Sequence, residues 1–221
     1  MARRRGRTIP AQGIRGILGR QRGSLGRLEI AEKRSAHALP PPPHPPPRLR
    51  RPRLSDAAEM VPLLNDREVA RFIPLIPQPY TRRDWAAWMR KHARGPERRP
   101  EGLSYPFTIE MGGRIIGNIG YRWDAKDRAA NIGYIVGEKF RRQGIATEAA
   151  RAITDHAFAA LKAERVWATV IEGNRGSLKV LRNCGMRLEG VLRKHTVHRG
   201  RRVDLEHYSV LRSEWKGRRK R

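Results

Sequence analysis

The stretch Arg141-Arg142-Gln143-Gly144-Ile145-Ala146 decides how this chain is interpreted, because it joins a strand-like segment ending near Val136 to a helix-like segment that begins at Thr147. A turn of small residues that opens directly into a helix leaves several backbone N–H groups unpaired, and the helix dipole adds partial positive charge there. Gly144 and Ala146 allow a ligand to approach the backbone, and the two arginines supply charge. The turn therefore predicts a phosphate site, although an ordinary helix start has the same pattern.

A second motif begins 30 residues after Gly144. It reads Asn174-Arg175-Gly176-Ser177 and leads through a short apolar segment to Cys184-Gly185-Met186. Asn and Ser both cap helices, so this motif alone would indicate only a helix N-terminus. Together with the upstream turn, it favours one ligand site built from two elements.

In order and spacing, these motifs resemble the GNAT acetyltransferase superfamily and, within it, the RimJ/RimL-like branch. The resemblance runs through Ile132-Gly133-Tyr134-Ile135-Val136, the loop at 141–146, Thr147-Glu148-Ala149-Ala150 and Asn174-x-x-Ser177-x-x-Val180-Leu181 with Gly185, and it spans residues 48–215. It implies an α+β fold with a mixed central sheet of about seven strands and helices on both faces. In that fold the sheet splays apart, and acetyl-CoA occupies the opening.

The resemblance also implies roles for individual residues. Backbone groups at the end of the strand before the loop would pair with the pantetheine arm, and those of the loop would hold the pyrophosphate. Asn174 would hydrogen-bond to the pantetheine end, and Ser177 would protonate the leaving thiolate. The amine would attack the thioester directly, through an oxyanion that backbone N–H groups stabilise. The cofactor-binding residues expected in this way are Ile135, Val136, Arg141, Arg142, Gln143, Gly144, Ile145, Ala146, Thr147, Asn174 and Ser177.

The sequence does not identify the group that removes the proton from the amine. Related proteins often carry an acidic residue where this chain has Asn131, so Glu110, Glu172 and Tyr208 are the catalytic candidates beside Ser177. An α-amino group with a pKa of about 7.7 is partly neutral at pH 7, whereas a lysine with a pKa of about 10.4 is almost wholly charged. A weak base therefore favours the N-terminus of a protein as acceptor, and the RimJ/RimL resemblance implies ribosomal proteins.

The remaining titratable side chains suggest no further chemistry. Cys184 is the single cysteine, which excludes an internal disulfide and agrees with a reducing compartment, and we expect a packed thiol. His195, His198 and His207 lack the spacing of metal ligands, so we expect strand or loop positions and no metal.

The charge is distributed unevenly along the chain. The formal net charge is +27, of which residues 1–53 contribute +12. Residues 1–47 predict a disordered Arg/Gly- and Pro-rich extension, ending in the run 40–47, which should form a polyproline rod unable to join a core. Residues 48–215 predict one acetyltransferase domain, and 216–221 a basic tail. The basic ends could contact RNA or the ribosome; a neutral extension from a start site assigned too far upstream is the favoured alternative for residues 1–47.

The chain contains no apolar run of the length that a membrane span needs, so we expect no membrane contact and a cytoplasmic protein. The Arg-rich, acid-free start leaves an organelle transit peptide as an alternative. Trp85, Trp88 and Met89 are expected in the core or in a substrate wall. The pattern predicts helices at 55–64 with Ser55 as cap, from 81 with a capping box of Thr81 and Asp84, at 144–161 and at 177–183. It predicts strands at 105–110, 114–123, 129–137, 165–171, 186–192 and 203–211, with a hairpin turn at Met111-Gly112-Gly113 between the first two.

Three functions remain open from the sequence. The first is an acetyl-CoA-dependent N-acetyltransferase that acts on a protein N-terminus. The second is an acetyltransferase for a small amine such as a polyamine or an antibiotic. The third is a basic RNA- or ribosome-binding protein that keeps the fold without turnover. The intact loop at 141–146 with Asn174 and Ser177 favours an enzyme over a binding protein.

Overall fold

A computed structural model describes residues 27–28, 44–92, 97–99 and 102–217 of the chain. Most of the predicted extension 1–47 and residues 218–221 of the predicted basic tail lie outside this described part. The expected disorder of the extension and the expected RNA contacts of both ends therefore stay predictions. Within the described part, no helix is both long enough and apolar enough to cross a membrane.

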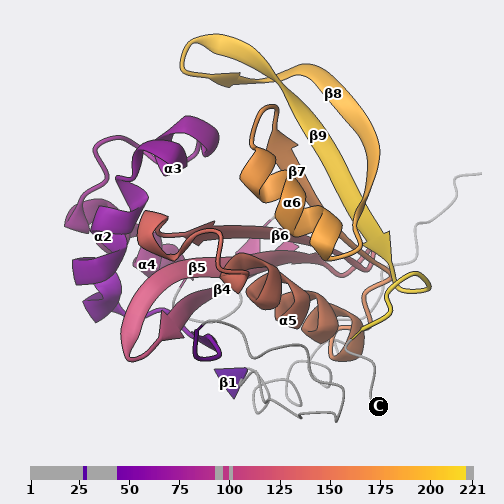
Figure 1. Ribbon diagram of the computed structural model, residues 1–221, viewed down its shortest axis with the longest axis horizontal. Helices are drawn as coiled ribbons and strands as arrows, with labels where there is room; N and C mark the ends of the chain where they lie inside the picture. The colour runs from indigo at the N-terminus through magenta and orange to yellow at the C-terminus, as the bar shows by residue number, and fades with distance from the viewer. Residues whose placement is uncertain (1–26, 29–43, 93–96, 100–101, 218–221) are drawn as a thin grey trace, which may run out of the picture.

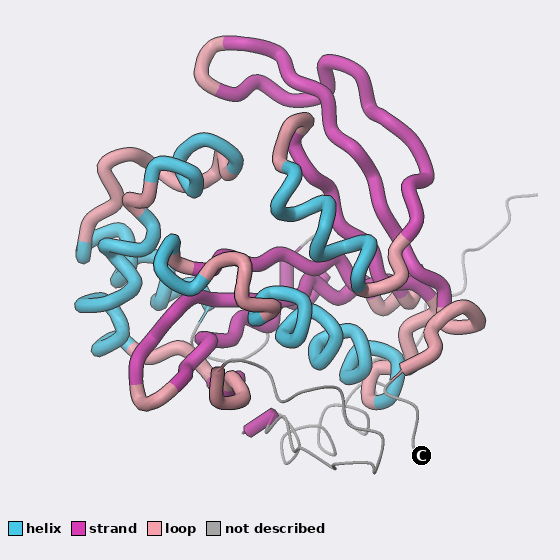
Figure 2. The backbone as a smooth tube through the Cα atoms, in the orientation of Figure 1, coloured by secondary structure: helices cyan, strands magenta, loops and turns pink. Residues whose placement is uncertain are grey.

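One mixed sheet organises the described residues (Figures 1 and 2). Its strand order is β1-β2-β4-β5-β6-β7-β9-β8, with β3 paired to β4, and only the β6–β7 pair is parallel. β1 has only two residues and β3 lies off the main order, so the other seven strands carry the sheet, as predicted. The strands are β1 Arg27–Leu28, β2 Arg48–Arg50, β3 Glu97–Arg99, β4 Gly102–Met111, β5 Arg114–Asp124, β6 Ala129–Val136, β7 Arg165–Ile171, β8 Arg187–His198 and β9 Arg201–Leu211.

Helices cover both faces of this sheet. Successive side chains of a strand point to opposite faces, and the neighbours Ile115 and Ile116 on β5 belong to two different buried clusters. This confirms the expected two-sided arrangement. The helical elements are η1 Leu54–Asp56, α2 Ala57–Leu64, α3 Arg67–Phe72, α4 Arg82–His92, η2 Glu138–Phe140, α5 Ile145–Ala159 and α6 Arg175–Asn183.

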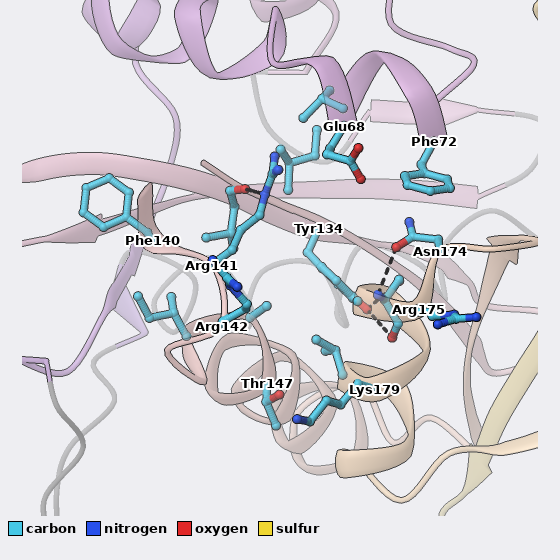
Figure 3. Close-up of a pocket in the computed structure, with 18 of the residues that line it drawn as sticks. Glu68, Phe72, Tyr134, Phe140, Arg141, Arg142, Thr147, Asn174, Arg175 and Lys179 are labelled. Carbon is cyan, nitrogen blue, oxygen red and sulfur yellow. Dashed lines mark hydrogen bonds between the residues drawn. The ribbon is translucent and has the colours of Figure 1, made fainter. Parts of the chain in front are cut away.

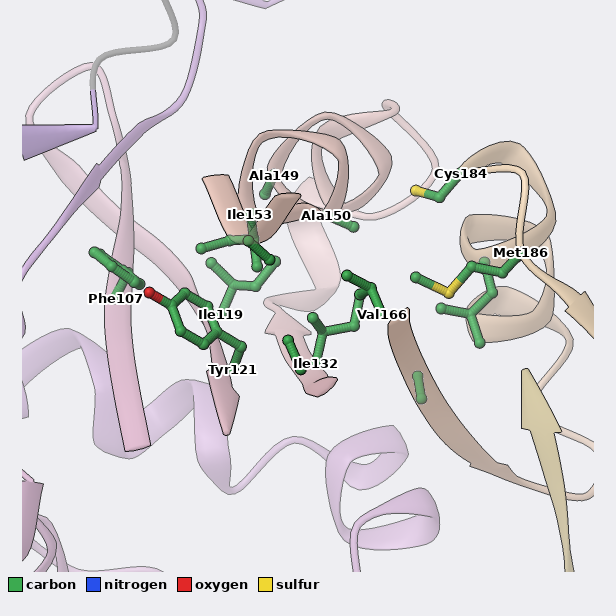
Figure 4. Packing of buried hydrophobic residues seen from close by; sticks show 14 of the residues in the cluster. Phe107, Ile119, Tyr121, Ile132, Ala149, Ala150, Ile153, Val166, Cys184 and Met186 are labelled. Carbon is green, nitrogen blue, oxygen red and sulfur yellow. The ribbon is translucent and has the colours of Figure 1, made fainter. Parts of the chain in front are cut away.

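The larger cluster lies between α5 and the strands β4 to β7 (Figure 4). Ala149, Ala150 and Ile153 form the buried stripe of α5 and are fully inaccessible to solvent. The stripe follows the helical spacing expected from the sequence, and it packs on apolar strand residues such as Ile119 and Ile132. The small alanine side chains let α5 lie close to the sheet, which fixes the position of the loop before it.

The smaller cluster covers the other face, beneath α2 and α4. Trp85 and Met89 are buried there with Met60 and Leu64, and Trp88 packs against them while partly exposed. Of the two roles expected for these aromatic residues, the structure therefore supports core packing. Burying a side chain of this size contributes on the order of 2–3 kcal/mol to folding.

Local capping signals in the sequence were mostly correct. Thr81 and Asp84 form the expected capping box, since the Thr81 N–H donates to the Asp84 carboxylate at 2.8 Å and the Asp84 N–H donates to Thr81 Oγ1 at 3.2 Å. Gly112 and Gly113 form the predicted β4–β5 turn with φ of +57° and +76°. Ser55, expected to cap the first helix, lies instead inside η1, and α2 begins after Asp56.

The hairpin of β8 and β9 extends further than the sequence predicted. The expected strands 186–192 and 203–211 continue to His198 and begin at Arg201, because Arg199 and Gly200 form a two-residue turn. Both turn residues have positive φ, 50° and 72°, as a type I′ turn requires. An arginine at the first turn position hides this signal in the sequence.

The fold makes one direct prediction at Gly117 on β5. A Cβ atom placed there would lie 2.1 Å from the Ile135 carbonyl oxygen, so the β5–β6 pair must move apart to accept any side chain. Gly117→Ala should lower the free energy of unfolding by about 1–3 kcal/mol, measured by urea denaturation. Gly133→Ala on β6 is the matched control, because no atom lies within 4 Å of the position that its Cβ would take. Equal stability of the two variants would contradict this account.

Candidate functional site

The site begins where β6 and β7 separate. These parallel strands pair only at Ala129↔Arg165, Ala130↔Val166 and Asn131↔Trp167, although β6 continues to Val136. The Asn131 side-chain amide donates to the Trp167 carbonyl at 3.3 Å, at the last paired position. Beyond this point the facing edges of the two strands no longer pair with each other, so an opening forms in the middle of the sheet.

A cavity of about 560 Å³ lies at this opening (Figure 3). Its walls come from α3, the end of β6, the segment 140–147, and the loop and helix that follow β7. Ten of the eleven residues expected to hold the cofactor line it. They are Ile135, Val136, Arg141, Arg142, Gly144, Ile145, Ala146, Thr147, Asn174 and Ser177.

The loop has the backbone geometry of an anion site. Arg142 and Gly144 both adopt positive φ, 63° and 87°, and alternation of this kind makes backbone N–H groups converge. α5 has no side-chain cap, and its first internal hydrogen bond runs from the Glu148 N–H to the Gly144 carbonyl at 3.0 Å. The N–H groups of the first helical turn are therefore left without a partner inside the helix.

Gln143 is the expected cofactor residue that does not line the cavity. Its side chain donates to the Lys139 carbonyl at 3.0 Å, and its own carbonyl lies 2.9 Å from Nε2 of His44. His44 and Pro47 are buried, so the end of the proline-rich run packs against the body of the protein. The expectation that this run cannot join a core is therefore wrong for the described residues 44–47.

Arg141 lines the cavity but also connects its walls. Its Nη2 donates to Asp66 Oδ1 at 2.7 Å, and its Nε donates to the Val136 carbonyl at 3.0 Å. Burial opposes ionisation of Asp66, but the contact with Arg141 and the backbone N–H groups of Val69 and Glu68 hold the pKa of Asp66 below its ordinary value. The guanidinium thus joins the loop, β6 and the N-terminus of α3.

The start of α6 forms the opposite wall. Asn174 Oδ1 accepts the Ser177 N–H at 3.1 Å, so Asn174 is the helix cap that the sequence allowed as an alternative. Ser177 Oγ lies 2.8 Å from the Tyr134 hydroxyl of β6, and this pair faces the cavity. Burial raises the pKa of Tyr134, and the hydrogen bond with Ser177 opposes that shift only in part. Two coupled hydroxyl groups therefore lie at the floor of the opening.

The other catalytic candidates lie outside this cavity. The Glu110 carboxylate accepts from Arg50 Nε at 2.6 Å, on the far side of β4 from the opening. Tyr208 is 1% exposed and donates to the half-buried Glu206 at 3.0 Å. Glu172 follows β7 and is exposed, but the cavity lining begins one residue later, at Gly173. Of the four candidates, Ser177 alone reaches the cavity.

Several lining residues were missed as site residues. Glu68 and Phe72 extend from α3 towards the cavity, opposite Asn174 (Figure 3). The signal for α3 was present, because Asp66 caps the helix by accepting the Glu68 and Val69 N–H groups at 2.8 and 3.2 Å. Among the described residues that line the cavity, Glu68 is the only one with a carboxylate, and the cationic side chains are more numerous. They are Arg71, Arg141, Arg142, Arg175 and Lys179.

Cys184 and the histidines occupy structural positions. Cys184 is 1% exposed beside α5, and burial raises the pKa of its thiol to about 11. His195, His198 and His207 lie on β8 and β9, as expected. His207 stacks on Trp167 with ring centroids 4.8 Å apart, and burial followed by the charge of Arg165 lowers its pKa.

Comparison with known proteins finds a matching family model and similar sequences. Residues 48–187 match the family model described as acetyltransferase (GNAT) domain. The uncharacterized N-acetyltransferase p20 of Bacillus licheniformis is 27% identical over 170 residues, which cover 76% of this chain and 94% of p20. YdaF of Bacillus subtilis (strain 168), whose name describes it provisionally as a ribosomal N-acetyltransferase, is 36% identical over 94 residues, which cover 42% of this chain and 51% of YdaF.

A solved structure with the same fold contains a ligand. Mycobacterium smegmatis RimJ in complex with CoA-disulfide is 28% identical and superposes with a TM-score of 0.66, over 76% of this chain and 83% of RimJ. The family model and this structure agree with the fold described above.

The loop geometry predicts the effect of Gly144→Ala. No atom lies within 4 Å of a Cβ placed at Gly144, so the cost of the change comes from its φ of +87°, about 1–2 kcal/mol, and from displacement of the loop. Calorimetry should show coenzyme A binding weakened about tenfold, or 1.4 kcal/mol. Gly113→Ala is the matched control, since its φ is +76° in the remote β4–β5 turn and a Cβ there is equally free of contacts. Equal affinity of both variants would contradict a phosphate role for this loop.

Burial of Cys184 predicts a slow reaction with iodoacetamide. With its pKa at about 11, the thiol is almost entirely protonated at pH 8, and only the thiolate reacts. Mass spectrometry should show alkylation at least 100-fold slower in the native protein than in urea, on the order expected from that shift. Fast alkylation of the native protein would show that the thiol is accessible.

Proposed function

This chain belongs to the GNAT acetyltransferase family and is an acetyl-CoA-dependent N-acetyltransferase, and from that premise we propose that its acceptor is the N-terminal α-amine of a protein. Ribosomal proteins are the favoured class. The names of two similar proteins, RimJ and the YdaF protein of Bacillus subtilis (strain 168), support this choice of acceptor.

In the proposed complex, acetyl-CoA lies in the opening between β6 and β7. The N–H groups of residues 144–147 hold the pyrophosphate, and the end of β6 pairs with the pantetheine arm. Ser177, hydrogen-bonded to Tyr134 at 2.8 Å, stands near the sulfur and supplies a proton to the leaving thiolate. The chemistry needs no covalent enzyme intermediate, which agrees with the burial and high pKa of Cys184.

The charge of the cavity lining is the observation that most supports the proposed acceptor. Among the described residues, the lining contains one carboxylate, Glu68, and five cationic side chains, Arg71, Arg141, Arg142, Arg175 and Lys179. A polyamine brings several positive charges into one small volume, and each charge without its own carboxylate is repelled. A protein N-terminus brings one ammonium group followed by a neutral backbone, which a single carboxylate can match. The cavity therefore favours an α-amine over a polycationic small molecule.

The basic character of the whole chain supports the same class of acceptor. A formal net charge of +27 attracts RNA-rich particles and the anionic cofactor, and it opposes the approach of free polycations. Nascent or assembled ribosomal proteins lie in such a negative environment. Long-range attraction of this kind raises association rates and weakens as salt is added.

An acceptor panel tests the proposal. With saturating acetyl-CoA, thiol release should be observed with peptides that begin with Ala or Ser, and it should be lost when the same peptides carry a blocked N-terminus and an internal lysine. Spermidine should react at least tenfold more slowly in kcat/KM, which corresponds to about 1.4 kcal/mol. A preference for spermidine or for the internal lysine would overturn the proposed acceptor. Mass spectrometry of host proteins with and without this gene would then identify the natural N-termini.

A further inference from the structure

One carboxylate of the cavity has no assigned role. Glu68 lies in the first turn of α3 and is the only acidic side chain among the described residues that line the opening. Figure 3 shows it directed into the cavity from the α3 side, with Asn174 on the facing wall. No carboxylate that the sequence suggested as a base reaches this position.

We propose that Glu68 is the subsite for the acceptor ammonium group and that it takes the proton which the amine must lose before attack. The inference rests on the proposed function, because it concerns the same cavity and an acceptor with one positive charge. Carboxylate and ammonium groups form charge-assisted hydrogen bonds, which are about twice as strong as neutral ones. Such a bond would both select the charged acceptor and place its nitrogen in the cavity.

The Asp66–Arg141 pair leaves Glu68 available for this role. Asp66 is the neighbouring acid, but its Oδ1 already accepts from Arg141 at 2.7 Å and from the Glu68 N–H at 2.8 Å. The same contacts fix the backbone of Glu68 relative to the loop at 141–147. The carboxylate of Glu68 is thus held beside the cofactor loop without being used by it.

The ion pair that Glu68 does form is weak. Its Oε1 lies 3.6 Å from Nη1 of Arg71, and the two side chains are 52% and 63% exposed. Exposed pairs with this separation contribute about 0–1 kcal/mol, so an incoming ammonium group can displace the arginine. Arg71 would keep a partner after such a displacement, because its guanidinium carbon already lies 5.0 Å from the centre of the Phe72 ring.

Proton removal from the ammonium group and proton donation to the leaving thiolate take place on opposite sides of the cavity. Glu68 on α3 accepts a proton from the ammonium group, which frees the nitrogen lone pair. The nitrogen then bonds to the thioester carbonyl carbon, and the carbon–sulfur bond breaks with its electron pair on sulfur. The thiolate takes a proton from Ser177, which regains one from solvent, while Glu68 and the new amide nitrogen each give a proton to solvent. The sum is one amide, one thiol and one released proton.

Glu68→Gln tests this assignment, because it keeps the size of the side chain and removes only its charge. The variant must rely on acceptor that is already neutral, which is only about 5% of an α-amine at pH 6.5 and nearly all of it at pH 9. With an Ala-starting peptide at saturating acetyl-CoA, kcat/KM should fall at least tenfold at pH 6.5 and approach the wild-type value at pH 9. The KM for acetyl-CoA should stay unchanged, and Glu68→Asp should restore part of the activity.

Glu138→Gln is the matched control, because Glu138 is an exposed carboxylate on η2 that does not line the cavity. It should follow the wild type at every pH. If the wild type acetylates the peptide and Glu68→Gln has the same pH profile as the wild type, the Glu68 subsite is overturned while the proposed function stands. An equal loss at all pH values would also overturn it, since that is the signature of a structural role. If the wild type does not acetylate α-amine peptides, the proposed function fails first.

Discussion

The early end of pairing between β6 and β7 is the constraint on which the rest of this structure depends. Three residue pairs join the strands, and at the last of them the Asn131 side-chain amide donates a hydrogen bond to the Trp167 carbonyl. A buried backbone group needs a hydrogen-bond partner. Where two strands diverge inside a protein, the N–H and C=O groups on their facing edges therefore need partners other than the neighbouring strand. Arg141 Nε supplies one such partner, to the Val136 carbonyl, and the opening leaves room for water or for an extended ligand that pairs like a strand.

Arg141 links that opening to elements distant in sequence. Its guanidinium donates to the Val136 carbonyl on β6 and to Asp66 at the start of α3, while its backbone belongs to the loop before α5. One side chain therefore fixes three segments relative to each other. The sequence suggested that this arginine supplies charge to a phosphate, but part of that charge is balanced by Asp66. Its described contacts make it equally a structural connection between the cofactor loop and the wall formed by α3.

The sequence predicted what local chemistry determines and failed where the answer depends on distant contacts. α5, the β4–β5 turn and the Thr81 cap follow from periodicity, glycine positions and capping pairs, each within one short segment. α3 has six residues and one buried side chain, Val69, so no apolar period reveals it. Nothing in the sequence distinguishes Glu68 from Glu110, because only the folded chain places one at the cavity and the other beside Arg50.

The contacts of the lining residues also place positive and negative charge on different sides of the cavity. Among the described residues, Asp66 balances Arg141 and Glu68 lies near Arg71, whereas Arg142 and Lys179 have no carboxylate within ion-pair distance. Figure 3 shows Arg142 and Lys179 on the Thr147 side, away from Glu68 and α3. Two cationic side chains without an ion-pair partner in the described part of the chain thus lie where α5 begins, and the one carboxylate of the described lining lies across the opening. An anionic cofactor and a cationic acceptor would be drawn to opposite sides, which lets one small cavity hold both without either displacing the other.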